Sequence, residues 1–87
     1  MVEVEEFLGD IIIQWKGVDI RFVIKTNYLP PLLWIEAWQP RAQRWGILKQ
    51  VVLDERILQL LRTLVKEGEK ALKKAEKDRR RWHGERA

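Results

Sequence analysis

The residues with the clearest binding chemistry are three tryptophans, Trp34, Trp38 and Trp45, within a short stretch of the chain. Indole rings offer flat apolar surfaces on which nucleic-acid bases stack, at roughly 1–3 kcal/mol per base and with little sequence preference. Cations that could attract phosphates occur around them in the sequence: Arg21, Lys25, Arg41, Arg44 and Lys49. Aromatic side chains interleaved with basic side chains favour a site for a single-stranded polyanion. Duplex DNA fits less well, because its stacked nucleobases offer no free faces.

Two strands are expected to position these tryptophans. Residues 32–39 alternate with period two, which puts Trp34, Glu36 and Trp38 on one face and apolar residues on the other. Residues 40–43 interrupt the pattern at Pro40, and a second β-rich run covers residues 45–53. A four-residue loop predicts these opposed pairs: Trp38 with Trp45, Glu36 with Ile47, and Trp34 with Lys49. Three tryptophans and a lysine would then share one face.

Two earlier strands are expected over residues 10–16 and 18–25, since both runs are rich in β-branched residues. A two-residue turn at Lys16-Gly17 predicts the pairs Trp15–Val18, Ile13–Ile20 and Ile11–Phe22, all on a core face. Trp15 is therefore assigned to the core. Arg21 and Lys25 fall on the opposite face, together with the three other tryptophans.

A helix is expected over residues 54–82, with Asp54 as its N-cap and Glu55 in its first turn. Its apolar stripe follows a three-and-four spacing: Leu58, Leu61, Val65, Gly68, Leu72 and Ala75. Glu69–Lys73 and Glu76–Arg80 are spaced as ion pairs. Residues 1–9 are expected to form a short acidic helix or a flap, and residues 83–87 a frayed tail. The predicted fold is α+β: one domain with a four-stranded antiparallel sheet (β-β-β-β-α) and the long helix packed on one face.

Composition narrows the class of protein. The chain has 87 residues, which allows one domain with a limited core. Its net charge is +4, with acidic residues concentrated in residues 1–10 and an excess of basic residues in the remainder. Polyanions are therefore the expected partners. The absence of cysteine favours an intracellular, cytoplasmic location, and no run is long and apolar enough for a membrane span. Abundant Glu, Lys and Arg are typical of a thermophile.

The sequence contains few candidate catalytic residues. The sequence has neither serine nor cysteine, and its one histidine, His83, has no neighbour at metal-ligand spacing. The five glycines form no phosphate-binding fingerprint. We therefore expect no enzyme activity, no cofactor, no metal and no small-molecule substrate.

The alternatives concern what covers the tryptophans. Large aromatic residues also dominate protein interfaces, so the same face could be a protein-interaction module or the interface of a homodimer, with no nucleic acid involved. Glu36 can pair with Arg21 or Lys49 and hold either cation in place. Tyr28, at the edge of the 26–31 connection, can stack on a base or support the loop. Stacking does not distinguish DNA from RNA, so an RNA ligand also stays open.

The pattern resembles the ThermoDBP-type single-stranded DNA-binding proteins of thermophiles and their shorter relatives. The residues that carry this resemblance are DIIIQWKGVDIRFVIK and LLWIEAW…RWGILKQVVLDERILQLL, within residues 10–61. The resemblance implies a homodimer whose sheets and helices grip single-stranded DNA on aromatic and apolar residues, without sequence preference. Trp34, Trp38 and Trp45 are the positions that match this role.

Overall fold

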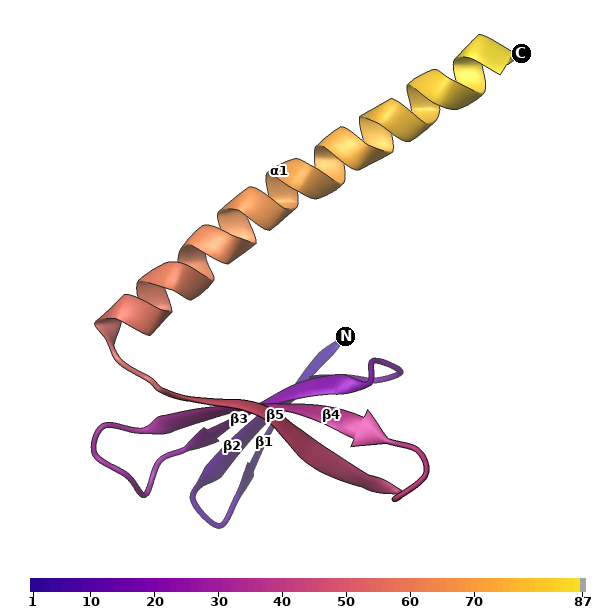
Figure 1. The fold of residues 1–87 in the computed structure, drawn as a ribbon. Helices are drawn as coiled ribbons and strands as arrows, with labels where there is room; N and C mark the ends of the chain where they lie inside the picture. Colours follow the sequence, from indigo (N-terminus) through magenta and orange to yellow (C-terminus); the bar gives the residue numbers. More distant parts are fainter. Residues whose placement is uncertain (87) are drawn as a thin grey trace. The chain divides into compact units, whose positions relative to one another are not determined.

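The structure, a computed structural model, describes the backbone of residues 1–86 and the side chains of residues 1–79. Five strands precede one helix (Figure 1). Their bounds are Val2–Phe7 (β1), Asp10–Trp15 (β2), Ile20–Lys25 (β3), Leu32–Gln39 (β4), Arg44–Val52 (β5) and Glu55–Arg86 (α1). The chain divides into two compact units, the sheet with the helix start through Ile57, and the helix from Leu58 onward.

The sheet is an antiparallel meander in the order β1-β2-β3-β4-β5, so every strand pairs with its neighbours in sequence. The expected acidic helix or flap at the N-terminus is wrong, because residues 2–7 form β1 and raise the number of strands from four to five. Leu8 and Gly9 make the two-residue turn to β2, both with positive φ (50° and 85°). This geometry is that of a type I′ hairpin turn, which glycine adopts readily.

The β2–β3 hairpin has a longer loop than expected. The chain turns at Gly17 (φ 89°), and the Val18 amide donates to the Trp15 carbonyl at 3.0 Å. The loop therefore takes four residues, 16–19, and pairs Ile13 with Phe22 where the two-residue turn predicted Ile20. The displacement is an even number of residues, so every side chain keeps the face that the alternation predicts.

The β4–β5 hairpin confirms the four-residue loop over 40–43 and the pairs Trp38–Trp45 and Glu36–Ile47. The predicted pair of Trp34 with Lys49 is wrong. A β-bulge in this ladder makes Gln50 the partner of Trp34 and pairs Lys49 with Ile35. The extra residue, Leu48, carries Lys49 to the opposite face, because one inserted residue reverses the alternation beyond it.

The register separates two faces of the sheet. The Trp face carries Ile12, Arg21, Val23, Lys25, Trp34, Glu36, Trp38 and Trp45. The apolar face carries Ile11, Ile13, Trp15, Ile20, Phe22, Ile24, Leu33, Ile35 and Val51. Among residues 1–79 the buried apolar side chains are Val23, on the Trp face, and Leu33, on the apolar face, each 4% exposed. The core within this chain is therefore small for a sheet with so many apolar residues.

The helix begins where the sequence predicts. The Asp54 carboxylate accepts a hydrogen bond from the Ile57 amide at 3.0 Å, which is the N-cap interaction. That bond, with a second from the Arg56 side chain, lowers the pKa of Asp54. The helix continues to Arg86, past the expected end at residue 82 and through most of the expected tail.

Apolar side chains of the helix include Leu60, Leu64, Val65 and Leu72, all of which are exposed. The expected ion pair Glu69–Lys73 is absent; Lys70 pairs instead with Glu67 at 3.5 Å, and the side chain of Arg80 lies outside the described residues. A single helix has no second element of its own unit against which to bury such a stripe.

Candidate nucleic-acid interface

Arg21 is held by two neighbours on the Trp face. Its Nε donates to Glu36 Oε1 at 2.7 Å, and its guanidinium carbon lies 4.4 Å from the centre of the Trp45 ring. Glu36 is buried and Arg21 is half-buried, so the pair is largely withdrawn from water. Of the two partners expected for Glu36, the structure selects Arg21. A guanidinium fixed between a carboxylate and an aromatic ring holds that ring in position. Its positive charge is balanced by the carboxylate, so it attracts a phosphate only weakly.

Lys25 repeats this arrangement on the other side of the face. Its Nζ donates to Asp10 Oδ2 at 2.7 Å and lies 4.6 Å from the centre of the Trp34 ring. Trp34 in turn donates from Nε1 to Gln50 Oε1 at 2.7 Å. The ring is thus anchored at its nitrogen and carries a cation on one face, which leaves it less surface for a base than an isolated indole.

Trp38 and Trp45 form the aromatic pair nearest the β4–β5 loop. Their ring centres are 5.6 Å apart and their planes meet at 66°, an edge-to-face contact. Trp38 also borders an open hollow of about 540 Å³, whose other lining residues are Gln39, Pro40, Arg41 and Ala42. Arg41 is exposed and has no ion-pair partner among the described side chains. This corner therefore brings an aromatic ring and an uncommitted cation together.

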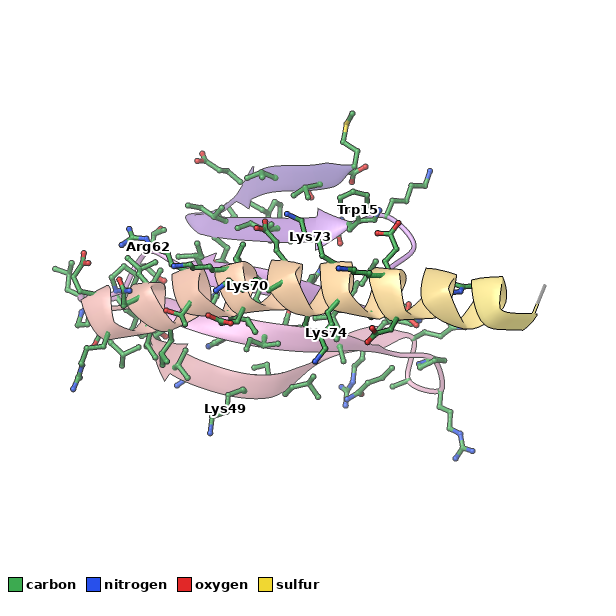
Figure 2. The ribbon with its side chains drawn as sticks, turned by 90° about the horizontal axis from the view of Figure 1, so that it is seen from above. Trp15, Lys49, Arg62, Lys70, Lys73 and Lys74 are labelled. Carbon is green, nitrogen blue, oxygen red and sulfur yellow. The ribbon has the colours of Figure 1, made fainter. Side chains whose placement is uncertain are left out.

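The remaining predicted site residues lie elsewhere. Arg44 pairs with Gln39 and Lys49 pairs with Ile35, so both project on the side of the apolar face. Figure 2 labels Lys49 on β5, one of the two edge strands of the sheet. Tyr28 is exposed in the connection between β3 and β4. Of the five predicted phosphate-binding cations, Arg21 and Lys25 share the Trp face but are paired there, and Arg41 lies at its corner.

The charge of the Trp face differs from the expectation of a basic sheet. Incorporation of β1 adds Glu3 and Glu5 to this face, opposite Gln14 and Ile12. With Asp10 and Glu36, they outnumber the two cations Arg21 and Lys25. Three of these four acids lie on β1 and β2, whereas Arg41 lies in the β4–β5 loop near the opposite edge. Negative charge is therefore concentrated at the β1 side of the face, and the exposed cation Arg41 lies at the β4–β5 end.

Two exposed aromatic residues, Trp15 and Phe22, lie on the apolar face, where the sequence predicted a core. Trp15, assigned to the core, is 52% exposed, and Phe22 is exposed as well. Both line an open hollow of about 330 Å³ together with Val2, Ile13, Gln14, Val18 and Ile20. The alternation of Val2 and Val4 in VEVEEF was the available signal that β1 extends this face.

Two further properties concern the described residues alone. None of the helices within them is long and apolar enough to cross a membrane. They contain no group of three or more His, Asp or Glu side chains arranged to hold a metal ion. No protein-family model matches the chain, and neither a curated protein nor a solved structure is significantly similar to it.

Proposed function

We propose that the protein binds single-stranded DNA without sequence preference, at the β4–β5 end of the Trp face. The observation that carries this proposal is the corner formed by Trp38, Trp45 and Arg41, where an indole borders an open hollow beside an unpaired guanidinium. A base stacked on Trp38 would have its phosphate within reach of Arg41, in the loop that follows β4. Neither group recognises base identity, so the binding is expected to tolerate any sequence.

The three tryptophans have different parts in this proposal. Trp38 is the stacking residue, because its ring lines the hollow. Trp45 supports it through the edge-to-face contact and is itself backed by Arg21. Trp34 is a secondary contact, since Lys25 lies on its ring and Gln50 accepts a hydrogen bond from its nitrogen. Phosphate attraction comes from Arg41, while Arg21 and Lys25 hold the rings in place.

The test is a fluorescence titration with a mixed-sequence single-stranded oligonucleotide, in the wild type and in Trp38→Ala. Loss of one stack is expected to weaken the affinity roughly tenfold, which is within the range for one base. Trp15→Phe is the control, because it removes an exposed indole from the apolar face and keeps an apolar aromatic side chain there. Equal affinities of the wild type and Trp38→Ala would contradict the proposal. A parallel titration with RNA determines whether the 2′-hydroxyl matters.

We also propose that the working form is a homodimer. The apolar face exposes Val4, Trp15 and Ile20, and the helix exposes Leu60 and Leu64. A chain of this size needs more buried apolar surface than it has by itself. The apolar stripe of a helix is proposed to cover the apolar face of the sheet, as in the predicted fold. That helix belongs either to the same chain or to the partner. Burial of both surfaces in a symmetric pair would supply the missing core.

A second candidate is a protein-interaction module without nucleic acid. The observation that favours it is the charge of the Trp face, where Glu3, Glu5, Asp10 and Glu36 outnumber the cations. The two candidates respond oppositely to salt. Binding to phosphates weakens steeply as salt rises, whereas an apolar protein interface holds or tightens. A titration at two salt concentrations therefore separates them.

A further inference from the structure

The helix carries a stripe of cations that the site on the sheet does not use. We define the basic stripe as Arg62, Lys66, Lys70, Lys73 and Lys77. Their spacing of four, four, three and four residues places them within an arc of about 80° on a helix of 3.6 residues per turn. All five are exposed, and the stripe is about 22 Å long at 1.5 Å per residue. Figure 2 labels three of them along α1.

The stripe lies opposite the helix's apolar residues. At 100° per residue, Leu61, Gly68, Leu72 and Ala75 centre on the far side of the helix from Lys66. Whatever buries the apolar side therefore leaves the basic stripe facing outward. Lys74 projects beside the stripe and not within it, and Figure 2 shows Lys73 and Lys74 on opposite sides of the ribbon.

Like charges lie close to one another along the stripe. Like charges four residues apart destabilise a helix, and the stripe has three such pairs: Arg62–Lys66, Lys66–Lys70 and Lys73–Lys77. The acids of the same segment, Glu67, Glu69 and Glu76, lie outside the arc. Lys70 of the stripe pairs with Glu67 at 3.5 Å, with both side chains more than half exposed. A bound polyanion would relieve this repulsion.

We infer that the basic stripe binds the phosphate backbone of single-stranded DNA. The inference rests on the proposed function for its choice of a single strand as the ligand. The lysines contribute point charges without base recognition, so the stripe adds affinity and no sequence preference.

The experiment measures how the affinity for a single-stranded oligonucleotide changes with salt in two double variants of equal charge. Lys66→Gln/Lys73→Gln removes two charges from the stripe, and Lys74→Gln/Arg79→Gln removes two charges outside it. Glutamine preserves helix propensity, and circular dichroism verifies equal helix content. For single strands each lost phosphate contact lowers the slope of log K against log salt by about 0.7, so the stripe variant should lose about 1.4. The control should lose much less.

The outcomes separate this inference from the proposed function. Equal slopes in the two double variants, with a tenfold loss still present in Trp38→Ala, would overturn the stripe and leave the sheet site intact. A wild type without affinity for single strands would overturn both. A duplex titration completes the set: if the stripe variant loses slope with duplex and not with single strands, the assignment to single-stranded DNA is wrong.

Discussion

Arg21 lies with its guanidinium carbon 4.4 Å from the centre of the Trp45 ring while its Nε donates to the carboxylate of Glu36. One cation thus joins β3 to a ring on β5 and to a carboxylate on β4. This relationship turns a residue predicted to bind phosphate into one that fixes a tryptophan. It also holds the Trp45 ring in place in the free protein, which would lower the cost of ordering that ring in the proposed complex.

Replacement of Arg21 by glutamine is expected to lower the free energy of unfolding by about 1–3 kcal/mol, because the buried carboxylate of Glu36 loses its partner. Urea denaturation measures the change. The matched control is Arg44→Gln, an exposed arginine without an ion-pair partner among the described side chains, for which a change within about 0.5 kcal/mol is expected. A similar decrease in the free energy of unfolding in both variants would mean that the Arg21–Glu36 ion pair stabilises the fold no more than an exposed arginine does.

Arg21 on the Trp face and Arg41 in the β4–β5 loop should differ in their contribution to the salt dependence of binding. Arg41→Gln is expected to lower the slope of log K against log salt by about 0.7, as the loss of one phosphate contact would. Arg21→Gln should leave the slope unchanged, since its charge is already paired with Glu36. The measurement is a titration of each variant at several salt concentrations. If the larger loss of slope occurred in Arg21→Gln, the assignment of the two roles would be reversed.

The proposed homodimer predicts a difference between the two faces of the sheet. Ile20 on the apolar face and Ile47 on the Trp face are 46% and 51% exposed, so Ile20→Lys and Ile47→Lys are closely matched substitutions. A charge at Ile20 is expected to dissociate the dimer, because a buried lysine without a partner is costly. Ile47→Lys should remain dimeric. Sedimentation velocity over a range of concentrations tests this, and a wild type that is monomeric throughout would exclude the dimer.

The cap of the helix should respond to pH. The Ile57 amide and the Arg56 side chain bond to the Asp54 carboxylate and hold the pKa of Asp54 below its ordinary value of 3.8. A lowered pKa means that the stabilisation is present above pH 3.8 and is lost as the pH falls through the folded-state pKa. Asp54→Ala should therefore lower the melting temperature of the helix signal at pH 7, and the difference from the wild type should shrink in acid.

Asparagine at position 54 is the control for this pH effect. Its amide oxygen can still accept the N-cap hydrogen bond but does not titrate in this range. Circular dichroism melts of the three proteins at pH 7 and at pH 2.5 provide the measurement. A difference between the wild type and Asp54→Ala that stayed constant with pH would show that the carboxylate charge is irrelevant to the cap.

Local patterns were enough to predict most of the sheet. The alternation over residues 32–39 and the polar break at Pro40 specified the pair Trp38–Trp45, and Asp54 was recognisable as a cap. β1 was missed because its turn, Leu8-Gly9, lacks the Asn-Gly or Asp-Gly that usually signals a two-residue hairpin. The glutamates of this strand also made its alternation of apolar and polar residues hard to recognise.

The candidate site was harder to predict than the fold. A bulge depends on pairing across two strands, so the change of face at Lys49 leaves no mark in the sequence of β5 alone. The pairing of Lys25 with Asp10 likewise depends on the register of β2 and β3. The sequence shows how many cationic side chains the chain has. It does not show which of them are paired with a carboxylate in the folded protein. That distinction decides which residues are free to meet a phosphate.

The meander order of the strands has a consequence for how fast the chain folds. Each strand pairs with the next one in sequence, through loops of two, four, six and four residues. Contacts between residues close in sequence need little loop-closure entropy, and sheets built from them fold faster than those with distant pairings. Stopped-flow refolding should therefore show a rapid phase independent of protein concentration. Association of two chains would follow it as a slower phase whose rate rises with concentration.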